Sequence, residues 1–127
     1  MNYTEHHLVA KTPYFDIPSC QYKGVKITPK GYVAGMSAKK DICFGILQNS
    51  PYAKQVAFIA PLFCGRSSYI YLSEQIDGGE LVTINNIGEA TKCNLDALMA
   101  DGLLETGGQK GELGVIRLGS FRNKGNR

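Results

Sequence analysis

Residues 80–93, ELVTINNIGEATKC, carry the strongest indication of fold in this sequence. Two short runs rich in apolar and β-branched residues, 81–84 and 89–93, enclose the segment NNIG at 85–88. Asn and Gly tolerate the positive φ angles that tight chain reversals require. The stretch therefore predicts a β-hairpin.

Short predicted strands extend in both directions from this hairpin. They lie at 21–28, 32–34, 42–49, 54–63, 67–73 and 113–119. Gly45 lies inside one of them, where a glycine often marks a bulge or a close approach of two backbones. The segment 94–104, NLDALMADGLL, is the exception. Its apolar residues follow a helical spacing after a possible Asn cap, so it predicts one short helix.

Length and composition agree with a small β-rich protein. The chain has 127 residues, of which 43% are hydrophobic and 20% charged, with 15 Gly and no Trp. This length corresponds to one domain, and this composition to a globular one. We expect a mainly β fold, a small β-barrel or β-sandwich-like domain of β-tulip type, with one short helix and an extended N-terminal arm. The expected boundaries are 1–19 for the arm, 20–119 for the domain and 120–127 for a basic flexible tail.

The arm combines prolines with apolar side chains. Pro13 and Pro18 oppose helix formation. An apolar arm requires a surface to cover, either on a partner or on its own domain as an edge strand, and the sequence leaves both open. Six residues are the candidate partner-binding side chains: Tyr3, Leu8, Val9, Tyr14, Phe15 and Ile17.

The charge distribution argues against nucleic acid as a partner, and the lack of a long apolar run argues against a membrane span. The net charge is +3, but residues 117–127 hold four bases and no acid, so the remaining chain is close to neutral. Specific duplex binding needs basic residues gathered on a folded face. No apolar run has the roughly 20 residues of a membrane span, and the start lacks a signal-peptide pattern. We expect no specific nucleic-acid partner, no membrane association and synthesis in the cytoplasm.

No motif for catalysis or metal binding is complete. The four cysteines, Cys20, Cys43, Cys64 and Cys93, form no CxxC pair and are expected to act as small apolar residues. His6 and His7 are adjacent, so in an extended chain they point to opposite sides and form no obvious metal site. The glycine-rich 107–114 lacks the phosphate-loop signature. We expect no enzyme activity, no cofactor and no metal.

The order of the segments is more informative than any single site. QYKGVKIT (21–28), FGILQNSP (44–51), GELVTINNIGEA (79–90) and GELGVIRLG (111–119) follow one another along the chain. This succession resembles the capsid decoration, or cement, proteins of tailed bacteriophages. The resemblance covers about residues 20–119 and is strongest over 44–51 and 79–90.

The resemblance implies a structural virion protein. Decoration proteins are compact β-rich domains, often homotrimeric, that bind the outside of the phage head and stabilise it by bridging major capsid proteins. The expected partners are therefore the major capsid protein and further copies of this chain, and the expected location is the capsid exterior. The apolar arm could add a strand to an exposed sheet edge of the capsid.

Two alternatives from other classes remain open. One is a carbohydrate- or host-surface-binding module displayed on the virion, for which Tyr69 and Tyr71 would lie on one face of a strand, opposite Ile70. The other is a small enzyme or nucleotide-binding protein that uses Cys43, Cys64 or Arg66. Reactive, ionisable cysteines would favour that second alternative.

Overall fold

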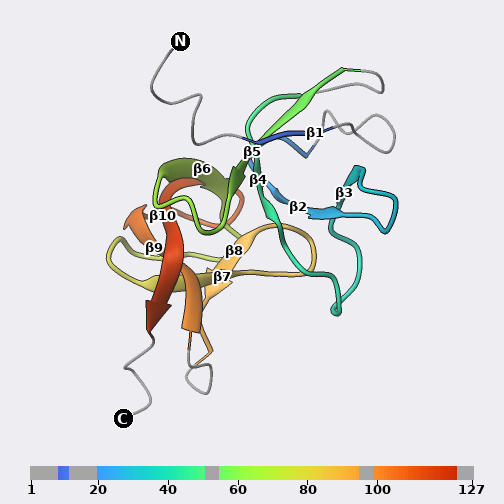
Figure 1. Cartoon of the computed structure of the whole chain (residues 1–127). Helices are drawn as coiled ribbons and strands as arrows, with labels where there is room; N and C mark the ends of the chain where they lie inside the picture. Colours follow the sequence, from blue (N-terminus) through green and yellow to red (C-terminus); the bar gives the residue numbers. More distant parts are fainter. Residues whose placement is uncertain (1–8, 12–19, 51–54, 95–98, 123–127) are drawn as a thin grey trace.

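The structure, a computed structural model, describes residues 9–11, 20–50, 55–94 and 99–122. Within these ranges the chain forms ten strands in two five-stranded sheets, and every pair of neighbouring strands is antiparallel (Figure 1). Among these residues neither sheet closes into a continuous ladder, although a single parallel bridge joins Leu72 to Ala90. Of the two expected architectures, the mainly β, sandwich-like one is therefore confirmed.

The N-terminal half of the chain forms one sheet and the C-terminal half the other. The N-terminal sheet has the order β1 (Val9–Lys11), β5 (Ala57–Pro61), β4 (Gly45–Leu47), β2 (Gly24–Ile27) and β3 (Val33–Gly35). The C-terminal sheet has the order β6 (Ser67–Tyr71), β10 (Leu113–Arg122), β9 (Met99–Thr106), β7 (Leu81–Ile84) and β8 (Ala90–Lys92).

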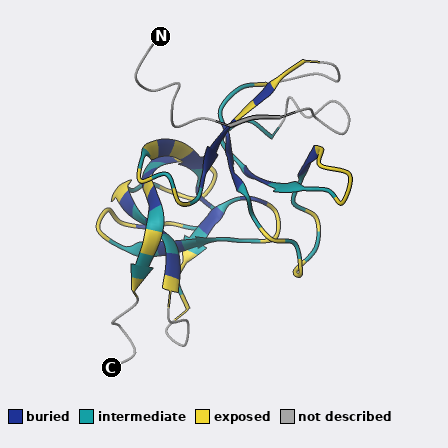
Figure 2. Ribbon diagram, viewed as in Figure 1, coloured by how far each residue is buried: buried dark blue, intermediate teal, exposed yellow. Residues whose placement is uncertain are grey.

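The main hydrophobic core lies between the two sheets. Ile46 and Ala60 of the N-terminal sheet pack with fully buried residues of the C-terminal sheet, among them Ile70, Leu104 and Ile116. Figure 2 shows buried positions alternating with intermediate or exposed ones along the long strands, as the two-residue period of a strand requires. Each such residue removes apolar surface from water, which is the dominant stabilising term of the fold.

The N-terminal sheet is apolar on both faces. Neighbours along its strands belong to different clusters: Ile46 packs in the main core, whereas Leu47 packs with Val25 and Ile59 in a second cluster. Because adjacent side chains on a strand point to opposite faces, the second cluster lies on the face directed away from the C-terminal sheet. All three residues of β4 are consequently buried, which explains the uninterrupted apolar run of the sequence there.

The predicted hairpin and the close approach at Gly45 are confirmed. β7 and β8 pair antiparallel around a turn in which Gly88 has a φ angle of 84°. At Gly45 a Cβ atom would lie 2.7 Å from Cγ2 of Ile59 and would also collide with the backbone of Ala60. Only glycine therefore allows β4 and β5 to lie so near each other.

The predicted helix over 94–104 is wrong for residues 99–104, which are regular secondary structure of another kind. Residues 99–104 belong to strand β9, and residues 95–98 lie outside the described ranges. β9 is hydrogen-bonded on one side to β10 and on the other to β7. Ala100, Gly102 and Leu104 are buried in alternation, so tertiary pairing overrides a weak helical spacing that spans few residues.

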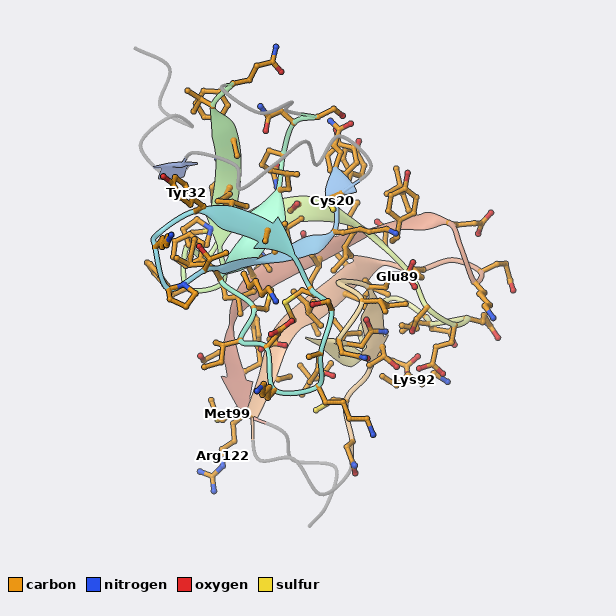
Figure 3. All side chains as sticks on the ribbon, turned by 90° about the vertical axis from the view of Figure 1, so that its right-hand side faces the viewer. Cys20, Tyr32, Glu89, Lys92, Met99 and Arg122 are labelled. Atoms are coloured by element: carbon orange, nitrogen blue, oxygen red, sulfur yellow. The ribbon has the colours of Figure 1, made fainter. Side chains whose placement is uncertain are left out.

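Strands β10 and β1 are the described elements nearest the two termini. β10 continues through Arg122, three residues beyond the expected domain end at 119, and Arg122 pairs with Met99. Figure 3 shows these two residues together at one end of the C-terminal sheet. In the arm, Val9 lies in β1 opposite Ile59, so this part of the arm adds an edge strand to its own domain. The remaining arm candidates, Tyr3, Leu8, Tyr14, Phe15 and Ile17, lie outside the described residues.

Candidate functional site

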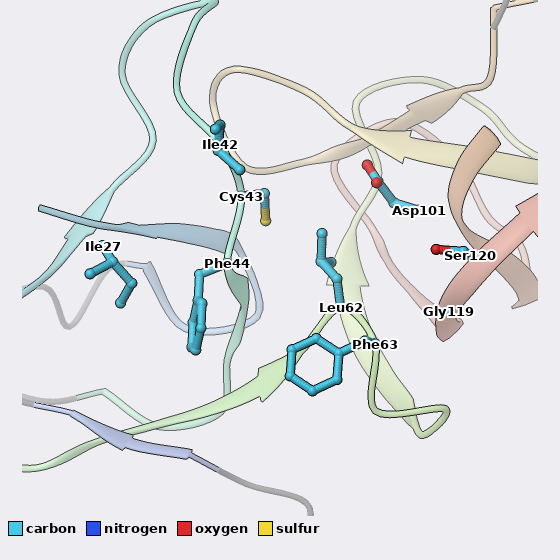
Figure 4. Close-up of a pocket in the computed structure, with 9 residues that line it drawn as sticks. All are labelled: Ile27, Ile42, Cys43, Phe44, Leu62, Phe63, Asp101, Gly119 and Ser120. Carbon is cyan, nitrogen blue, oxygen red and sulfur yellow. The ribbon is translucent and has the colours of Figure 1, made fainter. Parts of the chain in front are cut away.

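A cleft of about 450 Å³ opens where the loops of the two sheets meet (Figure 4). The N-terminal sheet and its loops supply most of the lining, and the ends of β9 and β10 supply the rest. The lining residues are Ile27, Ile42, Cys43, Phe44, Leu62, Phe63, Asp101, Gly119 and Ser120. This volume is within the range of pockets that hold small ligands or side chains of a partner.

Two large apolar side chains at this cleft are unusually exposed. Ile42 is 84% exposed and Phe63 is 79% exposed. Leu62, which also lines the cleft, is half-buried because it packs against the core. Exposed apolar side chains that gather around a hollow, rather than lying singly, mark surfaces that bind a partner. The cleft is thus the best candidate for a binding surface among the described residues.

A hydrogen-bonded loop holds Ile42 in its exposed position. Oδ2 of Asp41 accepts hydrogen bonds from the backbone N–H of Ser37 at 2.8 Å and of Ala38 at 2.9 Å. The ammonium group of Lys26 on β2 also contacts this oxygen, at 2.9 Å. These donors favour the ionised carboxylate, the hydrogen bond from Ser37 most, and they lower the pKa of Asp41 to about 2. The loop before Ile42 is therefore tied to β2 rather than loosely placed.

The Cys43 thiol and the Asp101 carboxylate of the cleft have structural partners. Burial, with a smaller effect of the nearby Asp101 carboxylate, raises the pKa of the Cys43 thiol to about 12. The Cys43 thiol lies 3.4 Å from the carbonyl oxygen of Gly45, and the Asp101 carboxylate accepts a hydrogen bond from the N–H of Ile84 at 2.8 Å. A thiol that stays protonated at neutral pH is a poor nucleophile, which argues against catalysis by Cys43.

Among the described residues, the other side chains considered for catalysis or metal binding do not form a common site. Cys64 lies half-buried beside the core, and Arg66 accepts a backbone hydrogen bond from Leu118 through its carbonyl oxygen. His6 and His7 fall outside the described residues. In the described ranges no group of three or more side chains is arranged as metal ligands. Nor do those ranges contain a helix of the length and apolarity needed to cross a membrane.

The tyrosines of β6 are arranged as predicted. Ile70 is fully buried in the core, while Tyr69 on the opposite face is 52% exposed. Tyr22, from the turn before β2, meets the ring of Tyr69 edge to face. Tyr22 was not among the candidates, because nothing in the sequence indicates that a turn of the N-terminal sheet reaches β6.

Sequence reasoning also missed the two residues that distinguish the cleft. Ile42 begins one predicted strand and Phe63 ends another, so both are predicted as ordinary strand residues. Strand β4 instead begins at Gly45 and strand β5 ends at Pro61, so Ile42 and Phe63 both lie on loops. Their exposure depends on where the strands end, which pattern alone places poorly.

The fold and the cleft together define a β-sandwich-like domain with an exposed apolar surface. One similar solved structure is described as "The crystal structure of head fiber gp8.5 N base in bacteriophage phi29". The likeness has a TM-score of 0.56 at 12% sequence identity and covers 87% of this chain and 92% of that one. At this identity it shows a shared fold. No family model matches the chain, and no curated protein matches it.

Proposed function

We propose that this chain is a structural protein of a bacteriophage head that binds the outer surface of the capsid and stabilises it by bridging major capsid proteins. One observation carries the proposal: the fold is shared over nearly the whole of both chains with the base of a head fiber. The order of sequence motifs, which resembles phage decoration proteins, supports the same class of function independently.

The apolar cleft supplies a surface for the capsid. Burying Ile42 and Phe63 against a partner removes apolar area from water, worth roughly 25 cal/mol for each Å² buried. The loop anchored by Asp41 presents Ile42 with little loss of conformational freedom on binding. The arm residues Tyr3, Leu8, Val9, Tyr14, Phe15 and Ile17 are a second proposed contact.

Copies of the chain act together in this proposal. The protein assembles as a homotrimer on the capsid exterior after synthesis in the host cytoplasm. Attachment of several linked copies raises the effective concentration of each contact, so a single cleft need not bind tightly. The role requires no catalysis and no cofactor.

Co-sedimentation with phage heads that lack the protein tests the proposal. We expect saturable binding at a fixed ratio to the major capsid protein, and a raised temperature of head disruption. A double variant, Ile42→Ser with Phe63→Ser, should weaken this binding at least about tenfold because the central apolar contact is lost. The matched control is Ile87→Ser, which changes an apolar residue that is 54% exposed and does not line the cleft.

The arm and the oligomer need separate measurements. Deletion of residues 2–8 keeps β1 and so leaves the N-terminal sheet complete. Weaker binding of that deletion variant would support the arm contact. Light scattering during size-exclusion chromatography gives the mass of the free protein. Failure of the wild-type protein to bind any head with a related capsid would refute the proposed function.

A further inference from the structure

A second hollow lies away from the apolar cleft, where the turn before β2 meets the outer side of β6 and β10. Its volume is about 350 Å³. The residues that line it are Tyr22, Gln48, Ser67, Ser68, Tyr69 and Val115. None of them lines the apolar cleft, so the two hollows are separate surfaces.

Tyr69 forms a supported aromatic platform in this hollow. On one side its neighbour across the ladder is Val115 of β10. On the other side the ring of Tyr22 meets it at an interplanar angle of 66°, with the ring centroids 5.4 Å apart. Edge-to-face contact of this kind fixes ring orientation while leaving a face available. Tyr69 is nevertheless about half exposed, so its ring is both held in place and accessible to a ligand.

The backbone of Tyr22 is held in an unfavourable conformation to supply this support. Its φ angle is 63°, a region that residues other than glycine rarely adopt. Its N–H donates to the carbonyl of Leu47 at 2.7 Å, and its own carbonyl accepts from the N–H of Tyr71 at 3.3 Å. The turn is therefore fastened to both sheets. Strain that the surrounding structure enforces in this way is concentrated at functional positions.

Polar groups surround the platform in fixed positions. The side-chain amide of Gln48 donates to the hydroxyl of Ser68 at 2.9 Å. Ser67 hydrogen-bonds the carboxylate of Glu105, which also pairs with the guanidinium of Arg117 at 3.1 Å. Arg117 lies directly opposite Ser67 in the β6–β10 ladder. The side chains of Gln48, Ser67 and Ser68 thus line the hollow with Tyr69, and the Glu105–Arg117 ion pair contacts it through Ser67.

This combination fits the chemistry of a sugar ring. A pyranose offers an apolar face of C–H groups, which packs on an aromatic ring, and a rim of hydroxyls that both donate and accept hydrogen bonds. A purely apolar partner would instead remove water from the polar side chains of Gln48 and Ser67 without replacing its hydrogen bonds, at a net cost. From this geometry we infer that the hollow at Tyr22 and Tyr69 binds a saccharide unit of a surface polysaccharide or glycan.

The inference does not depend on attachment to a capsid and is tested on the isolated full-length chain. An array of bacterial and host glycans identifies the ligand class, and two-dimensional NMR with the best mono- or oligosaccharide locates it. We expect millimolar or tighter affinity, with chemical-shift changes concentrated in β6, β10 and the turn at Tyr22. Changes centred on the apolar cleft would overturn the assignment, and so would a blank array.

Variants distinguish the platform from a general surface effect. Tyr69→Ala should weaken saccharide binding at least about tenfold, because an aromatic anchor in a hollow commonly dominates affinity. Glu105→Gln keeps the side-chain shape and should weaken binding to a smaller extent, with the fold checked by the same NMR spectrum. Phe63→Ala alters an aromatic residue of the apolar cleft and should leave saccharide binding unchanged. Equal affinity of wild type and Tyr69→Ala, or binding of an apolar peptide in place of sugars, would refute the inference.

Discussion

The aromatic rings of Tyr22 and Tyr69 join the two sheets at the protein surface. Tyr22 precedes β2 of the N-terminal sheet and Tyr69 lies in β6 of the C-terminal sheet, yet their ring centroids are only 5.4 Å apart. The core between the sheets is made of aliphatic side chains, so this pair is an additional connection at its rim. It also fixes the orientation of the platform proposed to bind saccharides.

A double-mutant cycle should reveal this coupling. Replacement of Tyr22 and Tyr69 by alanine, singly and together, is expected to give a coupling free energy of about 1 kcal/mol in urea unfolding. The control cycle pairs Tyr22 with Phe63, which lies at the other hollow and should show no coupling. Additive effects of the Tyr22 and Tyr69 substitutions would show that the ring contact contributes nothing to stability.

The Asp41 carboxylate should make stability depend on acidic pH. Its pKa is lowered from an ordinary value of 3.8 to about 2 in the folded protein. A group with a depressed folded pKa stabilises the fold above its unfolded pKa, and this contribution is lost as the pH falls through the folded pKa. In thermal unfolding, Asp41→Asn should therefore lower the melting temperature at pH 7, and its difference from wild type should shrink between pH 4 and pH 2.

Asp77→Asn provides the matched control for Asp41. Asp77 is an exposed turn residue, and its carboxylate has a single, long hydrogen bond from Gln75 at 3.3 Å. The same melting curves should change little for this variant. A constant difference between Asp41→Asn and wild type from pH 7 to pH 2 would contradict the role assigned to the ionised carboxylate.

The close approach of β4 and β5 at Gly45 predicts a severe effect of a single methyl group. Gly45→Ala should destabilise the fold by about 3 kcal/mol, because the new Cβ atom collides with backbone atoms of Ala60 that cannot move aside. Gly111→Ala, in open space but at a φ angle of 85°, should cost only about 1 kcal/mol from backbone strain. Urea unfolding of both variants checks the order of the two effects.

Truncation of a side chain in the core between the sheets should lower the free energy of unfolding far more than truncation of a side chain at the surface. Leu104 on β9 is fully buried, and Leu104→Ala is expected to cost about 3 kcal/mol in urea unfolding. Leu113 on β10 is 40% exposed, and Leu113→Ala should change stability by only about 0.5 kcal/mol. Comparable losses from the two leucines would mean that the packing between the sheets is not the main source of stability.

The cysteines should differ in their reactivity. Burial raises the pKa of the Cys43 thiol to about 12, and desolvation also raises the pKa of the Cys93 thiol, which is less buried. Alkylation by iodoacetamide at pH 8, followed by mass spectrometry, should modify Cys93 well before Cys43. Rapid modification of Cys43 in the folded protein would show that the cleft opens more than its structure indicates.

The sequence alone determined the class of fold and most of its strands. The NNIG turn after β7 and the period-two alternation around Ile70 are local signals. They depend only on backbone conformation and on one strand having a buried and an exposed face. The requirement for glycine at position 45 is likewise visible as an interruption of an apolar strand. These features can be predicted because neighbouring residues suffice to specify them.

Only the tertiary structure decided the rest. Residues 99–104 form a strand because β7 and β10 supply hydrogen-bond partners on both sides, and no local pattern contains those partners. The exposure of Ile42 and Phe63 likewise depends on where paired strands end. The meeting of Tyr22 with Tyr69 depends on how one sheet packs against the other. The two hollows described above are built from such long-range contacts, so the sequence predicted the strands and the tyrosine platform of β6 but not the way loops and sheets enclose the surfaces proposed to bind.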